Sequence, residues 1–589
     1  MSNDLELELI EDSRMVMHDR IPFPVQQGSA SVNPMSYQFN SVTPSTQSVV
    51  IQCPSLDNIT DLNVFIRGTM TFTIGGTIVD NNTKTINYGV GVNDTTFNSF
   101  PYNRLLQTVT AQFNNTSVTL NSGNVVSSLL EYASREELSN SNCMTPMQLN
   151  NYGLYSPEYA ATPGSIFANY LNSYDWKNAS NASYPAVFTA NGIKATGSVV
   201  PATISIDFCE PLLGLSPLLF GDKGGSGIRG VNNIVLNMVT DSTAKQAIKY
   251  CGTILPANYS VAVAFSNMYA DVTFLTAKPF MLSKYGPRNV LEYCENDVYL
   301  TSNLSIGAAI GSTKVLNTSA VQLSSIPKAV IFAVRPQLSS QSWQTADYKF
   351  PITAVSGNFN SMNGLLSGAS KQQLFRMSSK NGSQLSYLQW GGKANVDGAI
   401  VATSGGSLCL SFSNDVNIPE SYLAPSSLGQ YTLSFSLTVE NTVGVPAIFP
   451  APAGDIPIEI VMIVVSDGCF STSAGISEKY TSLLDKEKVM SVLSQEPKVD
   501  AGNDKASEFE NVGQAISGGR RVRRHQHKKH HMHVGRGDAE GEGSGSGIAF
   551  GESKGYGSPA FGEARRHVGR PRKSASGDAH RKLSRRVKF

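Results

Sequence analysis

The chain has 589 residues, of which 41% are apolar and only 15% are charged. This length exceeds one ordinary domain and the apolar content suffices for two packed cores, whereas a charged fraction below the ~25% usual for soluble proteins disfavours a fold of solvated helices. The net charge of +1 hides an asymmetry, because residues 520–589 hold 18 Lys and Arg against 6 Asp and Glu, while residues 1–519 hold 28 against 39. A basic tail on an acidic body predicts a polyanionic partner for the tail.

Residues 1–25 are expected to form a flexible N-terminal arm. Their acidic start lacks the basic and then apolar order of a secretion signal. The seven cysteines lie far apart and include no CxxC pair, which indicates reduced thiols used as small, mostly buried apolar side chains. We therefore expect synthesis in a reducing compartment.

The body of the chain is dominated by alternation of apolar and polar residues, the period of strands with one buried face. The clearest case is the segment 431–439, and two solidly apolar strands occupy 329–334 and 460–465. Loops rich in Gly, Asn, Ser and Pro separate the strands, where a parallel sheet would need crossover helices. The pattern predicts an all-β fold of sandwiches or jelly rolls.

The body has room for two such sandwiches, which we expect over residues 26–285 and 286–475. The two halves show no residue-level repeat, so this division rests on length and pattern. The longest apolar run, 460–465, is too short to cross a bilayer.

Residues 476–495 carry the best helical pattern of the chain, with apolar residues from Tyr480 to Leu493 on one side and charges on the other. Such a helix packs on its own domain or docks on a neighbouring subunit, and the sequence leaves both open. The apolar pattern then ends, and the composition predicts a disordered basic tail over residues 496–589.

Histidine placement excludes most catalytic chemistry from the body, because His18 lies in the arm and the other seven histidines follow residue 520. Ser-His-Asp and Cys-His catalysis and HExxH zinc sites all need histidine. Gly225–Gly230 satisfies GxGxxG but leads into a strand-like segment, which favours a plain loop over a dinucleotide site. We expect no enzyme, no metal site and no cofactor.

The tail holds three basic clusters, which can release counterions from a nucleic-acid backbone without reading its sequence. The predicted nucleic-acid-binding residues are Arg520, Arg521, Arg523, Arg524, Lys528, Lys529, Arg565, Arg566, Arg570, Arg572, Lys573, Arg585 and Arg586. A nuclear-import signal and a merely solvated tail are the alternatives. The sequence Gly569-Arg570-Pro571 also resembles the core of an AT-hook, whose arginine enters a narrow minor groove.

Several segments between residues 200 and 440 resemble double jelly-roll major capsid proteins. Ile204–Asp222 is similar to a stretch near the end of their first jelly roll, and 326–336, 359–367 and 373–382 are similar to segments in capsid proteins of polinton-like viruses, adintoviruses and their relatives. In this lineage, which includes adenovirus hexons, two fused jelly rolls stand upright and three chains form a pseudo-hexameric capsomer. The resemblance implies the same double jelly-roll fold and the same assembly here.

A second resemblance concerns processing. Ile516-Ser-Gly518-Gly519, followed by Arg520, is similar to the [MIL]-x-Gly-Gly site cut by adenovirus-type cysteine proteases, and it lies where the acidic body meets the basic tail. The resemblance implies cleavage after Gly519 by a viral cysteine protease, which would free a DNA-condensing peptide. The alternative is an ordinary flexible glycine pair. A long basic C-terminal extension departs from the family pattern.

These observations predict the major capsid protein of an icosahedral DNA virus, which assembles into trimeric, pseudo-hexameric capsomers. The expected partners are sister subunits, neighbouring capsomers, minor capsid or vertex proteins, and viral DNA through the tail. The expected location is the virion, after assembly in the host nucleus or cytoplasm. The alternative function is a minor virion or nucleic-acid-binding β-sandwich protein, such as a vertex or adhesion component.

Overall fold

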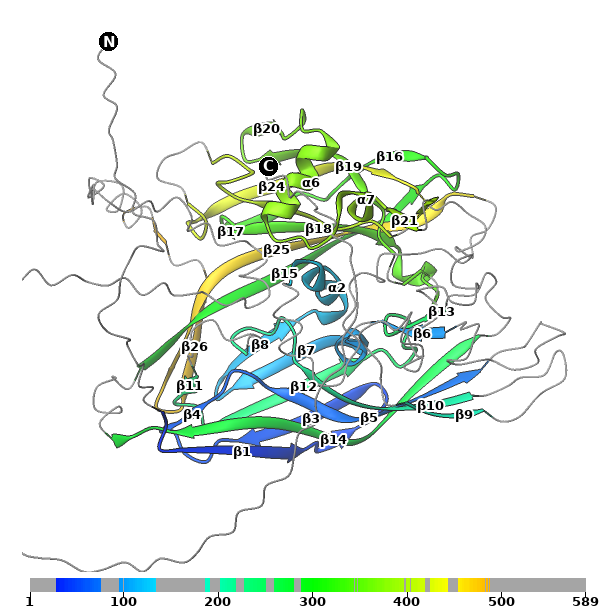
Figure 1. Ribbon diagram of the computed structural model, residues 1–589. Coiled ribbons are helices and arrows are strands. Elements are labelled where there is room, and N and C mark those ends of the chain that lie inside the picture. The colour runs from blue at the N-terminus through cyan, green and yellow to red at the C-terminus, as the bar shows by residue number, and fades with distance from the viewer. Residues whose placement is uncertain are drawn as a thin grey trace, which may run out of the picture. The chain divides into compact units, whose positions relative to one another are not determined.

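The computed structural model describes most of the body of the chain, and strands supply most of its regular structure (Figure 1). The described residues are 28–75, 95–98, 100–133, 186–190, 202–218, 227–250, 259–279, 288–343, 345–346, 348–396, 399–402, 404–418, 424–442, 454–481, 484–485 and 487.

The first half of the body forms two facing sheets. One has the order β11-β4-β14-β5-β10-β9, with β1 paired to β14, and the other has the order β2-β3-β12-β7-β8; β6 and β13 form a separate pair. The strands are β1 Ser31–Gln38, β2 Ser41–Val42, β3 Thr46–Gln52, β4 Asn58–Thr60, β5 Phe65–Gly75, β6 Thr95–Phe97, β7 Leu106–Phe113, β8 Thr116–Leu120, β9 Ala186–Ala190, β10 Ala202–Pro211, β11 Ile228–Arg229, β12 Asn233–Thr240, β13 Ile248–Tyr250 and β14 Ser260–Thr276. Two helices, α1 Pro101–Leu105 and α2 Ser122–Tyr132, lie between these strands in the chain.

The second half repeats this construction with its own pair of sheets. One has the order β15-β25-β18-β23, with β26 paired to β25, and the other has the order β16-β24-β19-β20, with β17 also paired to β24. The strands are β15 Arg288–Ile306, β16 Thr313–Asn317, β17 Val321–Ser325, β18 Ala329–Pro336, β19 Ile352–Phe359, β20 Met362–Leu365, β21 Lys393–Val396, β22 Ala399–Ala402, β23 Leu408–Ser411, β24 Leu428–Glu440, β25 Ile456–Ser473 and β26 Ile476–Thr481. The helices are η1 Leu338–Ser340, α6 Lys371–Lys380 and α7 Tyr387–Trp390. Both α6 and α7 begin with a capping box, built on Ser370 and Ser386.

The two halves share one strand order. If the principal strands of each half are counted along the chain, one sheet runs first, eighth, third, sixth and its partner runs second, seventh, fourth, fifth. The first half has β1-β14-β5-β10 opposite β3-β12-β7-β8, and the second has β15-β25-β18-β23 opposite β16-β24-β19-β20. This order is that of a jelly roll made from Greek keys, so the predicted double jelly-roll fold is confirmed.

Alternation along β24 sets the core of the second sandwich. The five apolar residues of 431–439 are all buried, and the polar residues between them face outward. Phe435 meets Phe332 of the opposite sheet edge to face, with ring centroids 4.7 Å apart. The pattern seen in the sequence is therefore the pattern of one-sided burial.

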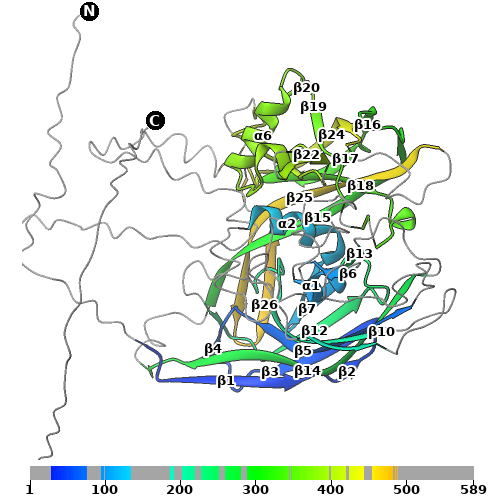
Figure 2. The ribbon, with the colours of Figure 1, turned by 45° about the vertical axis from the view of Figure 1, so that its right-hand side comes forward.

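The two solidly apolar segments, 329–334 of β18 and 460–465 of β25, do not alternate, because their sheet is buried on both faces. In β25 the even-numbered residues 456–464 join the core of the second sandwich, and the odd-numbered residues 461–465 join the core of the first. The segment 329–334 of β18 divides in the same way. Figures 1 and 2 show this sheet as a layer between the outer sheet of the second sandwich and the first sandwich, with α2 directly beneath it. A strand covered on both sides has no polar face.

The helix predicted over 476–495 is wrong at its start. Ile476–Thr481 is β26, which pairs antiparallel with 468–473 of β25. Ala474 and Gly475 form the two-residue turn, and both have positive φ, of 48° and 85°. A turn of this kind matches the twist of a hairpin, so the chain folds back as a strand where side-chain periodicity suggested a helix. Residues 488–495 lie outside the described part.

Candidate functional site

The residues that sequence patterns predicted as sites all lie outside the described part of the chain. These are the nucleic-acid-binding arginines and lysines of 520–586 and the cleavage site Gly518–Arg520, together with the arm of residues 1–25. Of the Gly-rich segment 225–230 the structure describes 227–230, which contains the short strand β11 in place of a plain loop and leads into strand β12, not into the helix that a dinucleotide site needs.

The described residues contain no histidine, and no group of three or more His, Cys, Asp or Glu among them could hold a metal ion. No helix in this part of the chain is long and apolar enough to cross a membrane. None of the five cysteines that the structure describes forms a disulfide. The notable polar chemistry lies where the two sandwiches meet.

The centre of this junction is a buried ion pair between the two sandwiches. Glu131 comes from α2 of the first sandwich, and Lys349 precedes β19 of the second; their carboxylate and ammonium groups are 2.5 Å apart and both side chains are only 6% exposed. The second oxygen of Glu131 accepts a hydrogen bond from the Ser407 backbone N–H at 2.8 Å. Lys349 Nζ also donates to Ser407 Oγ at 3.0 Å. Both charges are thus paired and hydrogen-bonded, which a buried pair requires.

Burial lowers the pKa of Lys349, and Glu131 opposes that shift, while the nearby charges of Arg104 and Arg335 act with the burial. Lys349 Nζ lies 3.5 Å from Ser128 Oγ, an arrangement that in an enzyme would suggest a serine nucleophile with a lysine base. Here Glu131 holds the ammonium group at closer range, so Lys349 acts as a structural cation.

A second buried ion pair joins the neighbouring strands β18 and β25, in the sheet of the second sandwich that faces the junction. Arg335 of β18 stands directly opposite Glu459 of β25, with Nε 2.9 Å from Oε1 and side-chain exposures of 9% and 4%. Arg335 also donates to the side chain of Asn124 and to the Gly123 carbonyl at 3.4 Å, both in α2 of the first sandwich. Burial lowers the pKa of Arg335, and Glu459 offsets this. One guanidinium group therefore ties two strands of one sandwich to a helix of the other.

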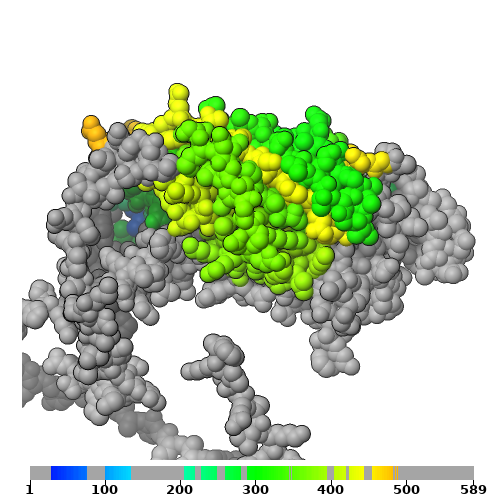
Figure 3. Space-filling view, turned by 90° about the horizontal axis from the view of Figure 1, so that it is seen from above, coloured from blue at the N-terminus to red at the C-terminus, as the bar shows by residue number. Residues whose placement is uncertain are grey.

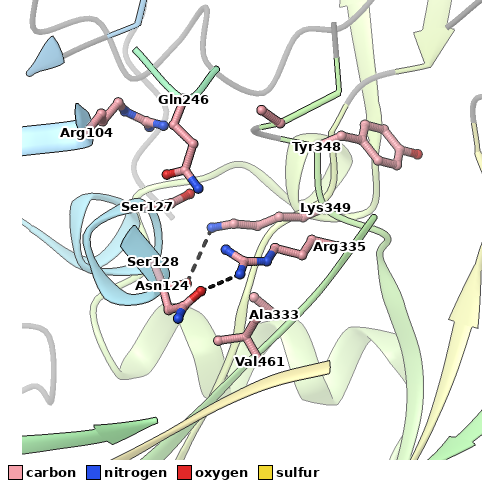
Figure 4. Close-up of a pocket in the computed structure, with 11 residues that line it drawn as sticks. Arg104, Asn124, Ser127, Ser128, Gln246, Ala333, Arg335, Tyr348, Lys349 and Val461 are labelled. Atoms are coloured by element: carbon pink, nitrogen blue, oxygen red, sulfur yellow. Dashed lines mark hydrogen bonds between the residues drawn. The ribbon is translucent and has the colours of Figure 1, made fainter. Parts of the chain in front are cut away.

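Between these pairs lies a small cavity of about 10 Å³ (Figure 4). Arg335 and Lys349 extend into it side by side from the second sandwich, and Arg104, Asn124 and Gln246 face them from the first. A space of this size holds about one water molecule. One water molecule in this cavity can solvate the charges of Arg335 and Lys349 at the junction, but the cavity has no room for a substrate.

Further hydrogen bonds around this centre converge on Ser407, which directly precedes β23. Tyr132 Oη donates to the Ser407 carbonyl at 2.8 Å, and Trp390 Nε1 donates to the same oxygen at 2.9 Å. Burial raises the pKa of Tyr132 well above its ordinary value, so its hydroxyl stays a donor. Ser407 is thereby held by both sandwiches at once.

The hairpin of β25 and β26 makes a second junction. Ser477 N–H donates to Asn115 Oδ1 at 2.8 Å, and Asn114 Nδ2 donates to Ser477 Oγ at 2.9 Å. Phe470 packs against Phe113 with ring centroids 5.2 Å apart. The end of the second sandwich is in this way fastened to the β7–β8 turn of the first.

Sequence reasoning did not identify these junction residues, although a signal was present. Arg335 directly follows the apolar run of β18, Glu459 interrupts the run of β25, and Lys349 stands between two aromatic residues. A charge inside an apolar strand needs a buried partner. The sequence alone does not show which partner it has.

Two protein families match consecutive parts of the chain. Residues 3–281 match the Sputnik virophage major capsid protein 1st domain, and residues 297–468 match the Major capsid protein V20 C-terminal domain. Capsid protein V20 of Sputnik virophage is 22% identical over 518 residues, which cover 83% of this chain and 82% of that protein.

Solved structures show the same fold. A chain from the Sputnik virophage structure determined by cryo-electron microscopy superposes with a TM-score of 0.70 at 18% identity, covering 86% of this chain and 99% of that chain. The mavirus major capsid protein superposes with a TM-score of 0.61 at 13% identity, covering 83% and 98%.

The repeated strand order and the polar junction define a protein of the double jelly-roll class, with two sandwiches locked together in one chain. The matches over both halves show that the chain is a double jelly-roll major capsid protein of the type found in virophages and large DNA viruses. Members of this family are structural components of the virion, which confirms the predictions of a virion location and of a protein that is not an enzyme.

Proposed function

We propose that three copies of this chain form a pseudo-hexameric capsomer of an icosahedral DNA virus. The observation that supports this is the repetition of one strand order in both halves. Three chains then contribute six sandwiches of like topology, and a threefold ring of such chains presents a nearly sixfold outline. The junction supports the same proposal, because its buried ion pairs hold the two sandwiches of each chain as one block.

In this proposal the tail acts on the genome. Residues 496–589 face the particle interior, and the basic clusters at 520–586 neutralise DNA phosphates without reading sequence. The acidic body repels DNA elsewhere, so binding is confined to the tail. Cleavage after Gly519 by a viral cysteine protease would release the basic peptide during maturation.

The proposed partners follow from the same assembly. Sister subunits complete the capsomer, neighbouring capsomers surround it, and minor capsid or vertex proteins occupy the remaining positions of the shell.

The capsomer is tested on the purified chain by native mass spectrometry and negative-stain microscopy. We expect trimers with a near-hexagonal outline. A chain that remains monomeric at the highest soluble concentration, or that forms dimers instead, would contradict the proposal.

A further inference from the structure

Cationic side chains surround the small cavity at the junction of the two sandwiches. Arg104 of α1 reaches it from the first sandwich, and Arg335 and Lys349 reach it from the second. The other polar groups of its wall are the amides of Asn124 and Gln246 and three hydroxyl groups. No Asp or Glu is among the described residues that line the cavity. A wall that holds three cations and no carboxylate favours a negatively charged occupant.

These three cations are buried in the body of the protein. Arg104, Arg335 and Lys349 are 3%, 8% and 5% exposed, although Lys and Arg are rarely buried in proteins. Seen from above, green and yellow side chains of the second sandwich form the surface of the described body, and the junction lies beneath this layer (Figures 1 and 3). In such surroundings the attraction between opposite charges is stronger than in water.

The carboxylates that pair with two of these cations are committed to other contacts. Glu131 uses one oxygen for Lys349, at 2.5 Å, and the other for the backbone N–H of the residue before β23, at 2.8 Å. Glu459 uses one oxygen for Arg335, at 2.9 Å, and accepts a hydrogen bond from Ser302 on the other, at 3.4 Å. Neither glutamate lines the cavity, so neither places a negative charge in its wall.

The positive charges of the wall also repel one another. Burial lowers the pKa of Lys349, and Arg104 and Arg335 lower it further against the opposing charge of its carboxylate partner. One water molecule can solvate these groups, but it carries no charge to offset their repulsion. A monoatomic anion has a similarly compact shape and a full negative charge, whereas a cavity of about 10 Å³ has no room for phosphate or sulfate. A halide ion therefore fits both the size and the charge of the cavity.

We propose that a single chloride ion occupies this cavity between Arg104, Arg335 and Lys349. Its ligands come from both sandwiches, so the complete site exists only when the two are docked. An ion that binds the docked state alone stabilises that state, and the gain grows with the logarithm of the chloride concentration once the site is mostly filled. Chloride thus adds a third contribution to the junction, beside the two ion pairs. The proposal concerns the two sandwiches of one chain and does not depend on the proposed capsomer.

Bromide, a halide with a strong anomalous X-ray signal, tests the position of the ion. Crystals of the full chain soaked in sodium bromide are expected to show an anomalous peak inside the cavity, in contact with the guanidinium group of Arg335 and the ammonium group of Lys349. Bromide peaks confined to exposed positions, with only water or no density in the cavity, would overturn the proposal.

Thermal unfolding of the full chain supplies an independent measurement. Sodium chloride is compared with sodium gluconate at equal ionic strength, because gluconate is too large for the cavity. The wild-type midpoint should rise in chloride, beyond the effect of gluconate, by about 1–2 °C for each tenfold increase above the dissociation constant.

A matched pair of variants locates this effect. Gln246→Glu puts a carboxylate on the cavity wall at almost unchanged side-chain size, so it should raise the midpoint in gluconate and remove the specific effect of chloride. Gln322→Glu makes the same replacement at an exposed position of β17, outside the cavity, and should keep the wild-type dependence on chloride. A chloride effect of equal size in all three proteins, or none in the wild type, would overturn the proposal.

Discussion

Buried charged residues decide how the two jelly rolls of this capsid protein are held together. Glu131 and Lys349 come from different sandwiches. Each would destabilise the fold without the other, because a lone charge in this position would be desolvated and unpaired. Arg335 and Glu459 have the same dependence across neighbouring strands. The Glu131–Lys349 pair depends on the docking of the two sandwiches, whereas the Arg335–Glu459 pair lies within the second sandwich and meets the first through Asn124 and Gly123.

The variant Glu131→Ala is expected to destabilise the junction by about 3–5 kcal/mol, because it leaves the Lys349 ammonium buried and unpaired. Denaturant unfolding followed by tryptophan fluorescence, to which Trp390 at this junction contributes, measures the effect. The control is Glu295→Ala, which removes a carboxylate from the partly exposed pair with Lys479 and should cost less than about 1 kcal/mol. Equal losses in the two variants would show that the junction pair contributes no more than a surface contact.

Asp297 on β15 gives a pH-dependent prediction. Although Asp297 is exposed on one side, partial desolvation of its carboxylate raises its pKa above the ordinary value; the neighbouring charge of Glu295 adds to the shift and that of Lys479 opposes it. The folded chain therefore binds this proton more tightly than the unfolded chain. The loss of stability begins as the pH rises through the unfolded pKa of about 3.8 and is complete above the folded pKa.

Asp297→Asn should accordingly raise the thermal midpoint at pH 7, and the gain over wild type should vanish near pH 3. Paired melting curves of the two proteins at both pH values provide the measurement. A gain that is the same at both pH values would mean that charge is not its cause.

At the scale of elements, the hairpin of β25 and β26 carries one sandwich onto the other. Its turn needs positive φ at Ala474 and Gly475, and its second strand places Ser477 against Asn114 and Asn115 of the first sandwich. The hairpin is thus a local structure with a long-range consequence: losing its turn geometry would release contacts between residues that are more than 350 positions apart in the chain.

Gly475→Val is expected to cost about 1–2 kcal/mol, because a β-branched residue is strained at a φ of +85°. Amide hydrogen exchange should accelerate both in 468–481 and in 113–116. Gly368→Ala is the control, since Gly368 has no positive φ and an added Cβ there would meet nothing within 4 Å. Faster exchange confined to 468–481 would show that the hairpin does not hold the first sandwich.

At the scale of the whole molecule, the chain divides its tasks between a body that carries the shell and a tail that carries the positive charge. The acidic body has 28 Lys and Arg against 39 Asp and Glu in residues 1–519, so its own surface is unfavourable for DNA. Proposals about the genome therefore concern the tail, and they are separable by experiment from those about the capsomer.

Binding of the purified chain to duplex DNA should weaken steeply with salt, with a slope of about −0.9 in log K against log salt for each phosphate contact. Replacing Arg520, Arg521 and Arg523 by Gln should reduce the slope by about 3. The same replacement at three cationic residues of the body, Arg376, Lys380 and Lys393, should leave it unchanged. If the body variant lost as much slope as the tail variant, the tail would not be the DNA-binding element.

Intact mass analysis of purified particles tests processing. Cleavage after Gly519 predicts chains that end at that residue, and Gly519→Val should leave the chain at full length. Full-length wild-type chains throughout the particles would remove the cleavage proposal while leaving the DNA-binding proposal untouched.

The amino-acid sequence by itself determined the class of this protein. Alternation in segments such as 431–439 indicates one-sided burial, the absence of histidine from the body removes most catalytic chemistry, and segments such as 326–336 resemble capsid proteins. These properties are local, because each depends on residues a few positions apart, and a single sequence displays them directly.

The tertiary structure alone decided three things. It paired Glu131 with Lys349 across more than two hundred residues, it turned 476–481 into a strand where periodicity suggested a helix, and it showed that 460–465 of β25 is solidly apolar because each face of the strand meets a different core. The physical reason is the same in each case: the free energy of a buried charge, a strand edge or an apolar face depends on what covers it, and the covering residues come from distant parts of the chain.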